Sequence, residues 1–88
     1  MGTKRWQVEV VVDEQDGRTY AEARLDTAGE RPITGRGRAR VNPADEDIPE
    51  IGDELAAARA LTDLGYRLLL AAADEIRAAT HEPVRLTH

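Results

Sequence analysis

Arginines recur at alternate positions in the middle of the chain, and they offer the clearest chance of chemistry at a surface. With one further arginine on the segment before, the set is Arg24, Arg36, Arg38 and Arg40. A two-residue period places side chains on one face of a strand, so these guanidinium groups form a candidate anion or nucleic-acid patch. The alternative is a solvated strand face on which the arginines pair across strands with Glu9, Glu22 or Asp26.

Two features of the composition weigh against nucleic acid as the main partner. The net charge is −5 at pH 7, which disfavours a general affinity for phosphate backbones. The chain also has only one Trp, two Tyr and no Phe, so few rings are present for base stacking on a sheet. Nucleic-acid binding through the arginine patch is therefore the alternative function, not the first one.

The other residue types that act in catalysis or ligate metals do not form a recognisable set. No cysteine or serine occurs, and the two histidines, His81 and His88, form no pair with a carboxylate at helical metal-binding spacing. The acidic run 45–47 lacks the alternating ligands and central glycine of a calcium loop. Gly35-Arg36-Gly37 is a lone glycine pair that precedes no helix. We therefore predict no enzyme, no cofactor and no metal site.

Size and composition indicate one small α+β domain over residues 1–88. The chain is 41% hydrophobic and 33% charged, which is typical of a globular protein with a core. No apolar signal-peptide core opens the sequence, and no apolar run approaches the ~20 residues that span a bilayer. We expect a cytoplasmic protein without a membrane partner.

Three segments alternate between apolar and polar residues, as half-buried strands do. They run over 6–13, 18–27 and 33–41, and a hairpin turn at Glu14-Gln15-Asp16-Gly17 joins the first two. The residues expected to face the core are Trp6, Val8, Val10, Val12, Ala21, Ala23, Leu25, Ile33, Gly35, Gly37, Ala39 and Val41. Short strands with tight turns predict an antiparallel meander with one face in solvent.

A long amphipathic helix is predicted over 51–80, after a proline-containing acidic connector that resembles a capping box at 47–50. The predicted core stripe is Ile51, Leu55, Ala58, Leu61, Gly65, Leu68, Leu69, Ala72 and Ile76. Gly65 in this stripe predicts either close packing on small strand residues or a hinge. The tail 83–88 is short enough for a fourth strand or an extended strap.

The segments GRGRARVNPAD, IGDELAAARALTDL and THEPVRLT resemble a family of small actinobacterial proteins of unknown function, and EQDGRTYAEARL extends the match to nearly the whole chain. The resemblance implies a two-layer fold grouped with double-stranded-RNA-binding domains. It does not imply RNA binding. Those domains carry a basic cluster at the start of their last helix, where this chain has Asp53, Glu54 and an acidic connector.

The length of the helix predicts a self-associating module. About 30 helical residues span roughly 45 Å, whereas nine-residue strands span about 30 Å. The helix should therefore overhang its sheet, and we place Leu64, Leu68 and Leu70 at a homodimer contact. The alternative is that the tail and the connector cover these leucines within a monomer. A contact with an unidentified protein partner is a further alternative.

Overall fold

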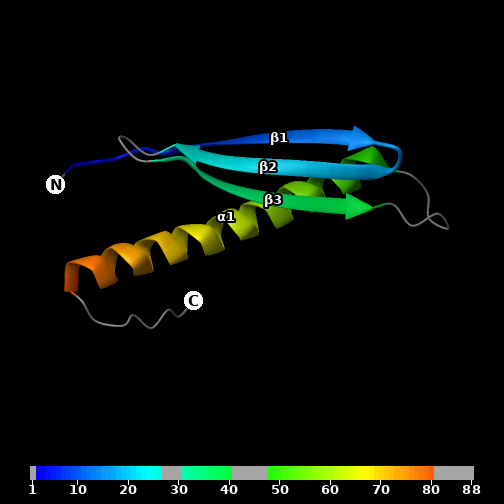
Figure 1. Ribbon diagram of the computed structural model, residues 1–88. Helices are drawn as coiled ribbons and strands as arrows, with labels where there is room; N and C mark the ends of the chain where they lie inside the picture. Colours follow the sequence, from blue (N-terminus) through cyan, green and yellow to red (C-terminus); the bar gives the residue numbers. More distant parts are fainter. Residues whose placement is uncertain (1, 27–30, 41–47, 81–88) are drawn as a thin grey trace.

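The computed structural model describes residues 2–26, 31–40 and 48–80, which form three strands followed by one helix (Figure 1). The strands are β1 (Gln7–Gln15), β2 (Arg18–Asp26) and β3 (Ile33–Arg40), and the helix is α1 (Pro49–Thr80). All strand neighbours are antiparallel in the order β1-β2-β3. The predicted α+β class and the β-β-β-α order are thereby confirmed.

A two-residue hairpin sets the register of the first two strands. Asp16 and Gly17 both adopt positive φ, at 52° and 73°, which gives the turn the twist that matches paired strands. Gln15 therefore lies opposite Arg18, and Val10 opposite Ala23. This register places Val8, Val10 and Val12 on the same sheet face as Ala21, Ala23 and Leu25, as the alternation predicts.

The core lies between α1 and the inner face of β2 and β3. The strand residues that it contains are Thr19, Ala21, Ala23, Leu25 and Ala39. Glycines let the helix come close, because a Cβ at Gly35 or Gly37 would overlap the backbone of α1. A sheet surface of this kind accepts a helix ridge of small side chains better than one of leucines.

The buried ridge of the helix is not the stripe that the sequence predicts, and that prediction is wrong. The residues buried along α1 are Gly52, Ala56, Ala60, Leu64 and Ala73. Ile51, Leu55, Leu61 and Ile76 from the predicted stripe are exposed. The largest apolar side chains dominate the periodic pattern, whereas the helix is buried where the backbone of Ala56, Ala60 and Leu64 comes against the glycines of β3.

The close packing predicted for Gly65 is also wrong. Gly65 is exposed, and a Cβ added there would meet nothing within 4 Å. The helix glycine that lies against the sheet is Gly52, where a Cβ would approach the Thr19 hydroxyl oxygen to 2.9 Å. Gly52, not Gly65, therefore allows the close approach at the start of the helix.

The first strand is left uncovered by the helix, contrary to the prediction that its valines are half-buried in the core. α1 runs beneath β3 and β2 and then leaves the sheet at an angle, as Figure 1 shows. All nine residues of β1 are exposed, and Val10 keeps 37% of its surface in solvent. Trp6, just before the strand, is 57% exposed. The alternation identified the inward face correctly, but α1 approaches β1 at only a few positions.

Several predicted features lie outside the described residues. These are residues 28–30 of the turn predicted over 28–32 between the second and third strands, Val41 at the end of the third strand, the cap residue Asp47 and the possible fourth strand at 83–88. At the start of α1, the Ile51 N–H donates a hydrogen bond to the Ile48 carbonyl at 3.1 Å. Within the described part of the chain, no helix is both long enough and apolar enough to cross a membrane.

Candidate functional site

The predicted arginine patch lies on the outer face of the sheet, opposite the helix. Arg24, Arg36, Arg38 and Arg40 are all exposed, and the last three alternate along β3 with residues that face the core. β3 is an edge strand, so one flank of the patch is open to solvent. The four arginines therefore lie on the sheet face that the alternation predicts.

Two of the four arginines have carboxylate partners. Arg36 Nε lies 3.6 Å from Glu22 Oε2 across the β2–β3 pairing, and Arg24 Nε lies 3.5 Å from Asp26 Oδ1 along β2. Both pairs are well exposed, so each contributes little stability. The solvated-face alternative thus accounts for Arg24 and Arg36, whereas Arg38 and Arg40 have no carboxylate within 4 Å among the described residues.

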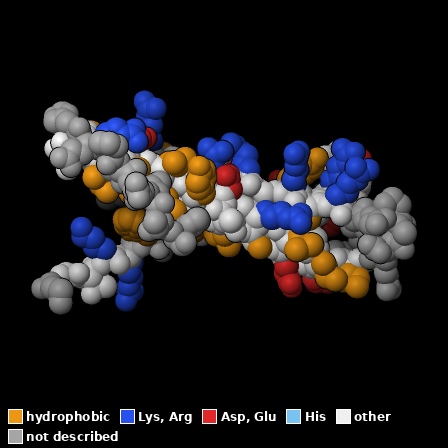
Figure 2. Space-filling view, turned by 90° about the horizontal axis from the view of Figure 1, so that it is seen from below, with side chains coloured by type: hydrophobic (Ala, Val, Ile, Leu, Met, Phe, Trp, Pro, Cys, Tyr) orange, Lys and Arg blue, Asp and Glu red, His pale blue; other side chains and the backbone are white. Residues whose placement is uncertain are grey.

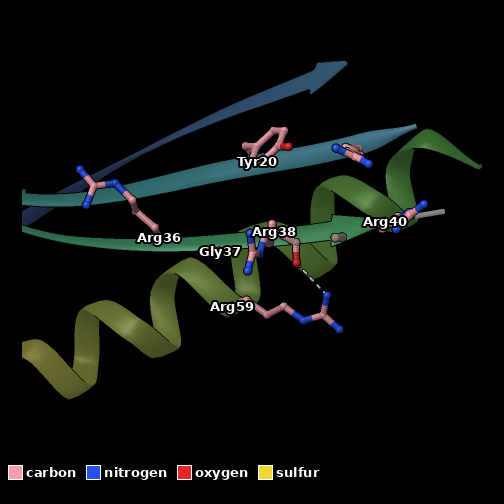
Figure 3. A pocket seen from close by; sticks show the side chains of 8 residues that line it. Tyr20, Arg36, Gly37, Arg38, Arg40 and Arg59 are labelled. Atoms are coloured by element: carbon pink, nitrogen blue, oxygen red, sulfur yellow. Dashed lines mark hydrogen bonds between the residues drawn. The ribbon is translucent and has the colours of Figure 1, made fainter. Parts of the chain in front are cut away.

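Two further arginines join Arg38 and Arg40 around a shallow depression. Arg18 lies directly opposite Arg40 on β2, and Arg59 approaches from α1 (Figure 3). The depression has a volume of roughly 630 Å³ and is lined by Arg18, Tyr20, Arg36, Gly37, Arg38, Ala39, Arg40 and Arg59. Sequence reasoning missed Arg18 and Arg59. The two-residue spacing of Arg18 and Tyr20 before Glu22 places Arg18 on the outer face, whereas nothing in the sequence indicates Arg59.

Two helix side chains bind the exposed backbone of the β3 edge. Asp63 Oδ2 accepts a hydrogen bond from the Arg36 N–H at 2.9 Å, and Arg59 Nη1 donates one to the Arg38 carbonyl at 2.8 Å. The spacings match, because four helix residues rise about 6 Å and two strand residues about 6.6 Å. The helix thus covers the inner face of β3 and also occupies its free edge.

The same contact perturbs the ionisation of Asp63. The hydrogen bond from the Arg36 backbone, followed by the one from Arg67 Nε at 3.0 Å, holds the pKa of the Asp63 carboxyl below its ordinary value of 3.8. A carboxylate that accepts hydrogen bonds is stabilised in its charged form. Asp63 is therefore an ionised edge cap at neutral pH.

The three leucines predicted for self-association do not share one environment. Leu64 is 5% exposed and belongs to the core, Leu68 is half-buried against that core, and Leu70 is 41% exposed. Seen from the helix side, hydrophobic side chains gather in two places, one over the half of the molecule where α1 leaves the sheet and one toward the opposite end (Figure 2). Leu64 is thus satisfied within its own chain, and the exposed apolar surface consists of other residues.

No metal-binding cluster occurs in the part of the chain that the structure describes. There, no three His, Cys, Asp or Glu side chains converge in a way that would hold an ion. Both histidines lie outside the described residues. The groups that do converge are guanidinium groups and one phenol ring, which bind anions and aromatic rings and do not by themselves form a catalytic set.

The fold and its surfaces define a small two-layer α+β protein, in which one long helix covers two strands of a three-stranded meander. The chain belongs to the Rv2632c-like family, whose model matches residues 4–85. The expected family of small actinobacterial proteins is thereby confirmed by mycobacterial relatives. The grouping of the fold with double-stranded-RNA-binding domains stays a prediction.

Relatives and a solved structure agree over nearly the full chain. The uncharacterized protein Mb1767 of Mycobacterium bovis is 49% identical over 85 residues, covering 97% of this chain and 89% of the relative. The uncharacterized protein Rv2632c of Mycobacterium tuberculosis is also 49% identical, covering 97% and 90%. The crystal structure of Rv2632c matches with a TM-score of 0.84 at 48% identity, over 94% of this chain and 98% of that one.

Proposed function

We propose that this protein is a non-enzymatic interaction module that acts as a homodimer. The observation that carries the proposal is the uncovered inner face of β1. Val8, Val10 and Val12 point to the same side as the buried residues of β2, yet α1 approaches β1 at only a few positions and leaves these valines exposed. A row of valines on the core side of a sheet is an apolar surface that favours burial.

The overall dimensions support a missing partner. The chain exposes 7446 Å², whereas a compact monomer of 9.7 kDa exposes about 5,100 Å². Its radius of gyration is 16.6 Å, against about 12 Å for a compact domain of 88 residues. A stable interface needs about 800 Å² from each partner. The surplus surface is large enough to supply such an interface.

A second copy is the occupant that fits both uncovered regions at once. In each chain, α1 leaves β1 largely uncovered. The C-terminal part of α1 extends past the sheet to Thr80 and has no strand against it. A two-fold arrangement pairs identical patches, so the overhanging helix of each copy reaches β1 of the other. The contact we propose contains Val8, Val10 and Val12 with Leu68 and Leu70, and it leaves Leu64 in its own core.

The experiment is a mass measurement by light scattering over a wide concentration range, with wild type and two valine variants. We expect a dimer mass for wild type and a monomer mass for Val10→Asp, because a carboxylate on the inner face disfavours its burial. Val11→Asp is the matched control, because Val11 is exposed on the opposite face of the same strand. A monomer mass for wild type at every concentration contradicts the proposal.

The alternative is a nucleic-acid-binding protein that uses the outer face of the sheet. The observation in its favour is the set of arginines without carboxylate partners around the depression. Binding of this kind falls steeply with salt, because each phosphate contact releases counterions. Absence of any gel shift with duplex RNA or DNA at low salt removes this candidate.

A further inference from the structure

The depression on the outer sheet face concentrates positive charge in a chain that is otherwise acidic. Five of the twelve basic residues line it, no carboxylate does, and the chain as a whole carries −5. Arg36 is the only one of the five with a carboxylate within 4 Å among residues 2–26, 31–40 and 48–80. Guanidinium groups gathered in this way hold a multiply charged anion through paired N–H donors.

The arrangement of the arginines lowers the stability of the sheet. Arg18 and Arg40 are direct cross-strand neighbours, and like charges in that position repel each other. Arg38 lies on the same face two residues before Arg40 and adds to the repulsion. By contrast, the cross-strand neighbours Arg36 and Glu22 carry opposite charges. An anion between these guanidinium groups relieves the repulsion.

A helix side chain is already held at the margin of the cluster. Arg59 Nη1 donates to the Arg38 carbonyl at 2.8 Å, which fixes part of the side chain against the strand edge. Figure 3 shows this side chain extending from α1 along β3, toward the end of the strand that carries Arg40. The remaining N–H groups of Arg59 widen the cluster from the sheet face to its edge.

The one aromatic residue of the depression lies directly beside the arginines. Tyr20 is the cross-strand neighbour of Arg38, and its side chain stands on the outer face of β2 at 44% exposure. A second shallow depression that Tyr20 also lines continues toward β1, where Val11, Asp13 and Glu22 line it. An exposed ring beside a basic cluster suits a flat base attached to phosphates, and the nearby carboxylates can accept hydrogen bonds from the base.

We infer that this surface binds a nucleoside polyphosphate, with the base on the Tyr20 ring and the phosphates among Arg18, Arg38, Arg40 and Arg59. Along the same face, Arg36 and Arg24 continue away from the cluster, but each is paired with a carboxylate. The unpaired positive charge is therefore compact, and a short, dense anion fits it better than a long strand. The net negative charge of the chain also opposes a long polyanion. The surface is on the opposite face from the proposed dimer contact, so the two proposals stand or fall separately.

The test is isothermal titration calorimetry of the full chain at low salt with three probes. These are adenosine triphosphate, inorganic tripolyphosphate and a 12-nucleotide single-stranded RNA. We expect adenosine triphosphate to bind with a dissociation constant below about 100 μM, in a salt-dependent manner. We expect tripolyphosphate to bind more weakly, because it lacks a ring to stack.

Variants separate the phosphate contacts from the base contact. The double variant Arg38→Gln, Arg40→Gln should weaken adenosine triphosphate and tripolyphosphate by at least about tenfold. Tyr20→Leu should weaken adenosine triphosphate by about fivefold or more and leave tripolyphosphate unchanged. Arg24→Gln is the matched control, since Arg24 lies on the same face outside the depression and is paired with Asp26.

A thermal measurement guards against loss of folding. The double variant should melt about 1–4 °C higher than wild type without ligand, because like charges on the sheet are removed. Tripolyphosphate should raise the melting temperature of wild type and not of the variant. Absence of binding to wild type, equal affinity for both phosphate probes with no effect of Tyr20→Leu, or tighter binding of the RNA than of adenosine triphosphate overturns the inference.

Discussion

The two edges of the sheet differ in how fully the chain itself covers them. At β3, the helix buries the inner face, and Asp63 and Arg59 bind exposed backbone groups of the strand edge. At β1, every residue is exposed, and no helix side chain of the described residues hydrogen-bonds to its backbone. An open strand edge invites pairing with another chain, and proteins block such edges when they act alone.

One side of the sheet is thus covered by its own helix, and the other is largely exposed. The protection of β3 leaves β1 as the edge that is open to strand or helix addition. The position of α1 decides this asymmetry, because one helix of ordinary width cannot cover three strands when glycines draw it toward β3. The valines of β1 then stay exposed on the inner face.

The largest expected effect comes from a substitution that disrupts the packing of α1 against β3. Gly37→Val places side-chain atoms where the backbone of Ala56 and Ala60 lies. The helix must move away from β3, so we expect destabilisation by about 3 kcal/mol or more, measured by urea denaturation. Stability close to wild type in this variant would show that the glycine contact does not fix the helix position.

Gly65→Ala is the matched control for that change. Gly65 is a helix residue whose added Cβ meets nothing within 4 Å. Alanine has the better helix propensity, so we expect stabilisation by up to about 1 kcal/mol. Opposite signs for the two glycine substitutions would separate a packing glycine from one that merely lowers helix propensity.

The next prediction concerns the environment of Trp6 beside the exposed strand β1. Trp6 is the only tryptophan of the chain and stands just before β1, largely in solvent. If a second copy covers β1, its fluorescence emission should shift to shorter wavelength as protein concentration rises, because the ring leaves water. Val10→Asp should abolish the shift and Val11→Asp should retain it. Emission that is independent of concentration, in samples where light scattering shows dimer formation, would place the contact elsewhere.

The smallest effect concerns the edge caps of β3. Asp63→Asn removes the ionised acceptor of the Arg36 N–H, so this amide should exchange with solvent faster, as hydrogen exchange detects. Because the pKa of Asp63 is lowered in the folded state, its contribution to stability is complete above the ordinary value of 3.8. It is lost as pH falls through the folded value. The melting temperatures of wild type and variant should therefore converge in acid.

Asp74→Asn is the control for the edge cap. Asp74 is exposed and pairs with Arg77 at 3.4 Å along the helix, with no bond to the sheet. This variant should leave both the exchange of the Arg36 amide and the acid dependence of melting close to wild type. An equal effect of the two substitutions would mean that Asp63 acts through general surface charge and not as a cap.

Much of the fold could be predicted from local patterns, and the site only in part. Alternation identified the strands and their inward faces, and helical periodicity identified the helix. The hairpin was predicted over 14–17, but its turn is confined to Asp16-Gly17, because Glu14 and Gln15 continue the strand. The arginines of β3 were found because a two-residue period is read along one strand. Arg59 was missed because its place beside Arg38 depends on how the helix crosses the sheet, and no sequence spacing reports that.

The sequence by itself determined the elements, their order and the two faces of each strand, because backbone preferences and alternation act between near neighbours. Only the tertiary structure decided which helix ridge is buried, which strand stays uncovered and which arginines meet. Residues on nearly every side of α1 are apolar or small, so periodicity alone left its orientation open. The fit of Gly52, Ala56 and Ala60 against the glycine-lined β3 resolved it, through contacts between residues far apart in the chain.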